Sequence, residues 1–528
     1  MMRLFKISCI FLCFVITFSL IYLPAWQIEY AHHDGYRFLE GIAGQYPVHS
    51  LAPINIPIGR FMAVILATGL GWLVHSIHDL SLIRFISILE LGLCASVCMI
   101  CWRRFFANTL QTILCCIAVF TLPPFQSMVA CAGLSFHLTA AVLASCAAAI
   151  SYRKPPGSPF WHYRTLLAAA VLFLAIATHQ AIAMFYWAVA AGCLISSAME
   201  SFKKMKEDAW NFLVAGLGAM GMYAVFLQIV KSRYAQQTLG IYNPYVLSHD
   251  YLDKLKWFVQ EPLVNALNLW NIFPVTGLAA AVGAVIVLTC AASVIQNVRN
   301  SRQPGTVIRR SFLICFFFLS LTILSVLPLL VAVGNAPWYR CLAGLTAIIV
   351  IALIWSAKEW LKLLPRLKQS LTLTLLLVVL SLYGAISANQ TVLRYRAIPS
   401  HIEMTYVKTM LRRAGLGNYN RIHLIRPVSP LMKSRYDEFG IVTSDILAAG
   451  VAPMMIGIIR DLARENGLDT VQIASDDDGG RIHFFFFRGK KQLPFCAFSV
   501  KLTSTAAGEA FAADHSTVII DMTKLKYD

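Results

Sequence analysis

One short segment gathers most of the side chains that could carry out acid–base chemistry. Asp34 lies in Ala31-His-His-Asp-Gly-Tyr-Arg37, directly after the first apolar stretch. A carboxylate in water can accept the proton of an attacking hydroxyl group, so Asp34 is the candidate general base. The alternative is an ordinary solvated loop. The candidate substrate contacts around Asp34 are His33, Tyr36, Arg37 and Glu40.

Several cations stand where a phosphate could meet them. Arg60 opens a second apolar stretch, and Tyr339 and Arg340 end the short aromatic segment Pro-Trp-Tyr-Arg. Guanidinium groups bind phosphate oxygens with paired, charge-assisted hydrogen bonds. Lys231 and Arg233 follow another apolar stretch and are weaker candidates, because basic side chains at such places also extend toward lipid headgroups.

Two further polar positions interrupt apolar sequence. Glu90 stands within a predicted membrane helix, six residues after Arg84. A charge in the bilayer is costly and suggests a functional role, although it can equally pair with a neighbouring helix. His179 and Gln180 form the apex of a predicted helical hairpin, where Gln180 is either a turn residue or a substrate contact.

The composition indicates a membrane protein. Of 528 residues, 58% are hydrophobic and 13% are charged, whereas soluble domains carry about 25% charge. Apolar runs of roughly 18 residues, long enough to cross a bilayer, recur up to residue 389. We therefore predict an all-α polytopic membrane protein with about eleven transmembrane helices. The predicted spans are 7–25, 82–102, 109–129, 133–150, 165–179, 181–199, 210–230, 274–296, 311–333, 341–357 and 371–389.

The net charge of +18 is explained by membrane topology rather than by nucleic-acid binding. Arg3 and Lys6 place the N-terminus in the cytoplasm, and the later basic loops follow on the same side when 61–78 does not cross the membrane. We therefore expect 61–78 to be a re-entrant or interfacial helix. The predicted cytoplasmic segments are 103–104, 152–164, 203–206, 299–310 and 358–368.

The sequence changes character after residue 394. We predict a membrane domain over 1–394 and a small α+β domain over 395–528, on the outer side, with strands alternating with one helix near 444–466. The run Asp476-Asp-Asp-Gly-Gly480 favours a hairpin turn over a cation site. Cys496 is the lone cysteine there, so no internal disulfide is expected.

This layout resembles that of the GT-C-fold membrane glycosyltransferases, and most of all the Gtr type II family of O-antigen glucosyltransferases. That family shows Asp-Asp-x-x-Arg followed by Gly-Arg-Pro. This chain has His33-Asp34-Gly35-Tyr36-Arg37 and Gly59-Arg60-Phe61. Since His33 replaces the first aspartate, no metal site is predicted, although a divalent metal is left open. No cofactor is expected.

The resemblance implies transfer of a sugar, with glucose as first candidate, from a polyprenyl-phosphate donor to a glycan acceptor such as O-antigen. It also implies a bacterial inner-membrane location with a periplasmic C-terminal domain. Two alternatives stay open. An O-antigen polymerase or ligase would need an arginine-rich outer loop, which 231–273 is not. A transporter or flippase would need several charges inside the bundle, where Glu90 and Arg84 are nearly alone.

Overall fold

The computed structural model describes most of the membrane part and the strands of the tail. The described residues are 2–31, 55–56, 58–71, 73–74, 76–153, 162–234, 250–272, 275–300, 304–332, 339–362, 365–414, 421–425, 458, 462, 470–475, 482–488, 491–492, 498–503 and 517–521.

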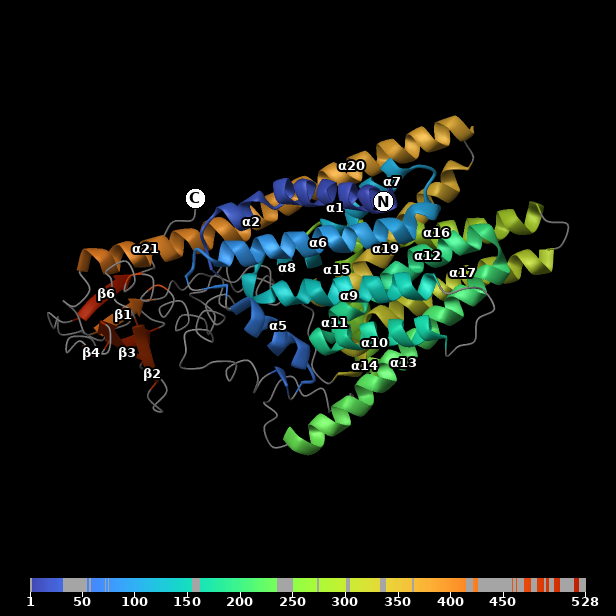
Figure 1. Ribbon diagram of the computed structural model, residues 1–528. Helices are drawn as coiled ribbons and strands as arrows, with labels where there is room; N and C mark the ends of the chain where they lie inside the picture. Colours follow the sequence, from blue (N-terminus) through green and yellow to red (C-terminus); the bar gives the residue numbers. More distant parts are fainter. Residues whose placement is uncertain are drawn as a thin grey trace.

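Helices make up the described membrane part, and Figure 1 shows most of them running along one long axis. The first are α1 (Met2–Ile21), α2 (Leu23–Gln27), α5 (Phe61–Gly71), α6 (Leu80–Trp102), η1 (Arg103–Phe105), α7 (Thr109–Phe120), α8 (Pro123–Ala130), η2 (Ala132–Leu134), α9 (Ser135–Tyr152), α10 (Tyr163–Thr178), α11 (Gln180–Ala183) and α12 (Phe185–Glu200). The others are α13 (Phe202–Tyr234), α14 (Tyr251–Gln260), α15 (Pro262–Leu267), α16 (Thr276–Asn300), α17 (Pro304–Ser325), α18 (Leu327–Val331), η4 (Tyr339–Leu342), α19 (Ala343–Leu361), α20 (Arg366–Val392), η5 (Leu393–Ala397) and α21 (Ile398–Ala414).

The helices confirm a multi-pass membrane protein but not the count of eleven spans. Within the described residues, seven helices are long and apolar enough to cross a membrane, or eight if the bent pair α7–α8 is one span. Three more predicted spans correspond to shorter apolar helices, Ile7–Ile21, Tyr163–Thr178 and Cys315–Ser325. The eleven-span topology therefore stays a prediction. The eleven-residue α5 is about 17 Å long, too short to cross, as expected for a re-entrant or interfacial helix.

The predicted span 109–129 contains a sharp bend that the sequence analysis did not anticipate. The chain bends by 66° between α7 and α8, because Pro123 and Pro124 cannot donate backbone hydrogen bonds. Other donors satisfy carbonyls near the break: the Tyr22 hydroxyl donates to Phe120 O (2.8 Å), and Trp270 Nε1 donates to Ala118 O (3.0 Å). A broken helix is tolerated in a membrane protein where such partners exist.

The core lies around α12 and α19. The apolar window of the α11–α12 run is entirely buried and that of the η4–α19 run is 83% buried. Close helix approach depends on glycine here, because a Cβ on Gly192 would lie 2.4 Å from the Trp102 ring. Small residues of this kind let membrane helices pack tightly.

Three segments predicted to be cytoplasmic meet at one end of the bundle. Arg104 forms an ion pair with Glu200 (2.8 Å), which also pairs with Lys204. Lys358 donates a hydrogen bond to the Phe105 carbonyl. The N-terminus lies toward this end in Figure 1. These loops therefore share one side, while the compartment on that side stays a prediction.

The tail contains one sheet, in the order β2-β3-β5-β1-β6, with β4 paired to β3. β1 is parallel to β5 and β6, whereas β3 is antiparallel to β2, β4 and β5. The register Ser475↔Ile482 makes β2–β3 a hairpin. The strands are β1 (Arg421–Ile425), β2 (Thr470–Ser475), β3 (Ile482–Arg488), β4 (Lys491–Gln492), β5 (Phe498–Thr503) and β6 (Thr517–Asp521).

The expected helix 444–466 lies outside the described residues, except for the buried Ile458 and Leu462. The turn 476–480 and Cys496 also lie outside them. The division into domains at residue 394 stays a prediction.

Candidate functional site

Arg60 is fixed at the start of α5 by a tight turn and an aromatic contact. Its backbone N–H donates to Asn55 O (2.7 Å), and Gly59, at φ +78°, supplies the left-handed residue of the turn. Phe61 then packs against Phe226 of α13, with ring centroids 4.9 Å apart. The side chain of Arg60 is thereby aimed at the hairpin between α10 and α11.

Gln180 receives Arg60 at that hairpin. Arg60 Nε donates to Gln180 Oε1 (2.8 Å), and Gln180 Nε2 donates to Ile58 O (2.7 Å) and to the Tyr223 hydroxyl. The Tyr223 hydroxyl in turn donates to Ile58 O (3.3 Å). Three segments far apart in the sequence are thus locked together. Gln180 is therefore an anchor for Arg60 as well as the apex residue that the sequence indicated.

Arg340, which lies 280 positions after Arg60 in the sequence, belongs to an element that packs against the same hairpin. It lies in the turn η4, which packs against α8 and α11. Gln180, the first residue of α11, is also the residue that binds Arg60. The structure therefore gathers the two arginines around the α10–α11 hairpin.

Two buried histidines, His137 and His179, also lie at the α10–α11 hairpin. The rings of His137 and His179 meet edge to face with centroids 4.4 Å apart, and both side chains are buried. His179 Nδ1 accepts the backbone N–H of Ile182 (3.4 Å), so a neutral His179 carries its proton on Nε2. We call Arg60, His137, His179, Gln180, Tyr223 and Arg340 the cationic cluster. Its two guanidinium groups favour an anion beside them.

Tyr339 does not belong to the surface of the cluster. Its side chain is fully buried, and its hydroxyl donates to Ile272 O (2.8 Å). Tyr339 therefore supports η4, and its predicted contact with the substrate stays a prediction.

The structure does not bring the remaining described candidates to the cluster. Glu90 is on α6 and accepts a hydrogen bond from Thr139 of α9, so it pairs with a neighbouring helix. Arg233 is exposed in the last turn of α13, and Lys231 belongs to the same helix. Among the described residues, no hydrogen bond or ion pair joins Glu90 or Arg233 to the cluster.

The candidates of the first loop lie outside the described residues. These are His33, Asp34, Tyr36, Arg37 and Glu40. Their roles stay predictions.

Two members of the cluster were not predicted. His137 and Tyr223 are each polar residues within long apolar helices, α9 and α13. An ionisable side chain inside a membrane helix is itself a signal of function, and His137 could have been found on that ground. Tyr223 gives no such signal, because tyrosine is common in apolar sequence.

Comparisons with known proteins found no matching family model and no matching curated protein. Among solved structures, the Archaeoglobus fulgidus oligosaccharyltransferase tethered with an acceptor peptide aligns with a TM-score of 0.39 and 12% identity, covering 84% of this chain and 59% of that one. The archaeal oligosaccharyltransferase AglB from the same organism, in complex with an inhibitory peptide and a dolichol-phosphate, aligns with a TM-score of 0.39 and 10% identity over 94% of this chain and 76% of that one. The chain thus spans about three fifths of the length of the first of these. TM-scores this low do not establish a common fold, and we draw no functional conclusion from them.

Proposed function

We propose that the chain is an integral-membrane glycosyltransferase of the GT-C type. It transfers a sugar, with glucose as first candidate, from a polyprenyl-phosphate donor to a cell-surface glycan such as O-antigen at the periplasmic face. The observation that carries the proposal is the convergence of Arg60 and Arg340 on the α10–α11 hairpin. Two guanidinium groups at one end of a membrane bundle suit a lipid-linked phosphate.

In this reaction the leaving group is the lipid phosphate. Its negative charge grows as the bond to the anomeric carbon breaks, so groups that hold the phosphate oxygens more tightly at that stage lower the barrier. Arg60 and Arg340 would hold those oxygens, and Gln180 and Tyr223 would keep Arg60 in place. The acceptor hydroxyl must lose a proton as it attacks, and Asp34 would take it.

The location of Asp34 in the chain supports this assignment. Ala31 is the last described residue before the loop, and Asp34 follows it by three residues. Three residues reach at most about 11 Å. The hydroxyl of Tyr30 donates to the carbonyl of Ala130 (2.7 Å), at the end of α8, and α8 also packs against η4 with Arg340. The segment that precedes Asp34 and the turn that carries Arg340 therefore both contact α8.

The phosphate role is tested with Arg60→Ala and Arg340→Ala in membranes supplied with a radiolabelled polyprenyl-phosphate sugar. Each should weaken donor use by about 10- to 100-fold, since a charge-assisted hydrogen bond contributes about 1.5–3 kcal/mol. Arg104→Ala is the matched control, because Arg104 is an exposed arginine at the opposite end. Full transfer by both cluster variants would show that neither arginine binds the phosphate.

The base is tested with Asp34→Asn, which keeps the size of the side chain and removes its basicity. Loss of a general base typically costs about 100- to 10,000-fold in rate. Glu40→Gln is the control within the same loop and should cost less. Wild-type transfer by Asp34→Asn would refute the assignment. Mass spectrometry of the surface glycan, with and without the protein, identifies the sugar.

A further inference from the structure

The segment between α2 and the first loop is held by a buried arginine. Arg84 of α6 is 1% exposed and donates to three backbone carbonyls: Nε to Ala25 O, Nη1 to Tyr30 O (2.9 Å) and Nη2 to Ile28 O (3.4 Å). Its guanidinium also lies 4.0 Å above the Tyr30 ring. A charge buried this deeply is stable only with such partners, so Arg84 is committed to this backbone.

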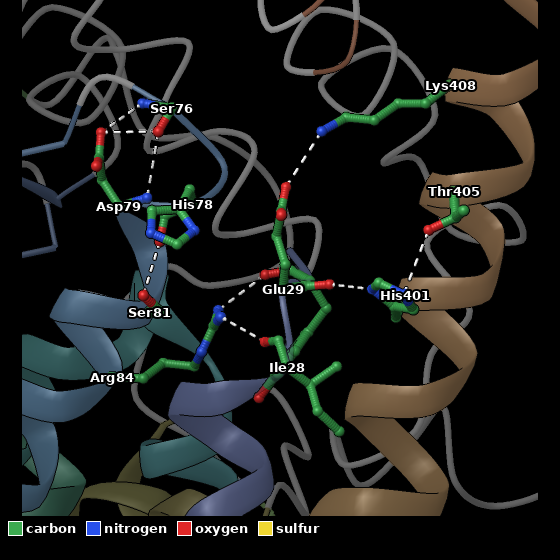
Figure 2. A network of polar contacts seen from close by, with 11 residues as sticks. Ile28, Glu29, Ser76, His78, Asp79, Ser81, Arg84, His401, Thr405 and Lys408 are labelled. Carbon is green, nitrogen blue, oxygen red and sulfur yellow. Dashed lines mark hydrogen bonds and ion pairs between the residues drawn. The ribbon is translucent and has the colours of Figure 1, made fainter.

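A second element holds the residue between those carbonyls. Nδ1 of His401 in α21 makes a 2.6 Å hydrogen bond to the Glu29 carbonyl. Lys408, about two helical turns further along the same face, pairs with the Glu29 carboxylate at 3.2 Å. Figure 2 shows Glu29 between Arg84 on one side and α21 on the other. The carbonyls of residues 25, 28, 29 and 30 are therefore each bound.

We propose that Arg84, His401 and Lys408 are positioning residues for the reaction, acting through the segment Ala25–Ala31. We call them the exit clamp. The inference rests on the proposed function, because what the segment delivers is the loop with Asp34. A base must approach its proton to within hydrogen-bonding distance, and a displacement of about 1 Å can cost a factor of 100 in rate. A loosened clamp should therefore lower turnover far more than it weakens donor binding, which the cationic cluster provides.

The clamp also ties the loop to the tail. α21 continues α20 without a break through η5, and it packs against β6. In Figure 1 this run extends along the molecule and ends at the strands. α21 therefore links Glu29 to the sheet of the tail.

The test is a charge exchange in the full-length protein. Lys408→Glu places two carboxylates together and should reduce kcat by about tenfold or more, with the donor KM changed by less than about threefold. The double variant Glu29→Lys/Lys408→Glu restores the ion pair with opposite polarity and should recover most of kcat. Lys362→Glu is the control, because it disrupts an exposed pair with Glu359 at the other end of the bundle and should leave both constants unchanged. Arg84→Lys should fail to replace Arg84, since lysine lacks the planar fork.

Hydrogen exchange provides a second readout that needs no activity. Amide exchange of the peptide covering residues 26–37 should accelerate in Lys408→Glu and slow again in the double variant. Unchanged exchange in Lys408→Glu overturns the clamp. Faster amide exchange together with wild-type kcat overturns the positioning role of the clamp. A loss of kcat that the double variant does not restore overturns it as well. If the wild-type protein transfers no sugar while exchange responds as expected, the proposed function fails and the clamp stands as a structural feature.

Discussion

We expect Gly59→Ala to disturb the position of Arg60, the residue that follows it, and so to weaken use of the donor. Gly59 has φ +78°, a backbone conformation that L residues with a Cβ rarely adopt. A Cβ built there would lie 2.3 Å from the Tyr223 hydroxyl and 2.6 Å from Leu227 Cδ2. Either the turn before α5 must open, which moves Arg60 from Gln180, or Tyr223 must withdraw, which breaks its contact with Gln180.

The two costs can be added. The left-handed conformation costs an alanine roughly 1–2 kcal/mol, and forcing a methyl group into a filled site costs about 1–3 kcal/mol more. The turn is therefore destabilised by about 2–5 kcal/mol. Since 1.4 kcal/mol corresponds to a factor of ten, donor use should fall by about 30-fold or more.

The assay is transfer from a labelled polyprenyl-phosphate sugar as a function of donor concentration, together with thermal unfolding in detergent. Gly69→Ala is the matched control: it lies in α5, no atom lies within 4 Å of its added Cβ, and alanine favours a helix over glycine by about 1 kcal/mol. It should keep activity and leave stability equal or higher. A Gly59→Ala protein with wild-type donor dependence would refute the link from turn geometry to Arg60.

Three further predictions concern the anchor, the topology and the opposite end of the bundle. Gln180→Leu removes the acceptor of Arg60 and the donor to Ile58 O, and we expect the donor KM to rise by about tenfold with the protein still inserted, as measured in membranes. Reporter fusions after residue 395 should report the outer side and fusions at 155, 205 and 305 the cytoplasm; a cytoplasmic tail would contradict the re-entrant assignment of 61–78. Hydrogen bonding and charge from Lys204, with Arg104, lower the pKa of Glu200, so this group stabilises the fold above the ordinary glutamate pKa and the stabilisation disappears as pH falls through the lowered value. Because Glu200 is largely exposed, Glu200→Gln should remove less than about 1 kcal/mol of stability at neutral pH, seen as a slightly weaker acid dependence of unfolding.

Much of the helical layout could be read from hydropathy, because each membrane helix must satisfy its own backbone in lipid and therefore appears as an apolar run. The bend at Pro123 was visible in the sequence, yet a window average does not register it. The first and ninth predicted spans, 7–25 and 311–333, correspond to α1 (Met2–Ile21) and α17 (Pro304–Ser325), which both begin and end earlier than predicted.

The cluster was harder to predict, since it depends on contacts between residues about 40 to 165 positions apart. Arg60 and Arg340 were found because guanidinium groups beside apolar runs suit phosphate. That Gln180 would bind Arg60 could not be inferred, because its partners come from two segments that are distant in the sequence. Arg84 was noted only as a charge near Glu90, and its real partners are backbone carbonyls, which a sequence does not distinguish.

The continuous helical run of α20, η5 and α21 passes both parts of the proposed site, the cationic cluster and the exit clamp. The helical run Lys368–Arg413 has 46 residues and is about 69 Å long, more than twice the hydrocarbon thickness of a bilayer. About half of it must therefore lie outside the lipid. Its first charges after the apolar stretch are Arg394 and Arg396 in η5, and Tyr395 packs beside Tyr339, the neighbour of Arg340. We propose that the cationic cluster lies at the depth where α20 leaves the membrane, which would suit a lipid phosphate. His401 lies about one turn beyond η5 and binds Glu29, so the exit clamp would lie on the aqueous side of this level. A base delivered from the clamp would meet the acceptor from the water side while the arginines hold the donor from the lipid side.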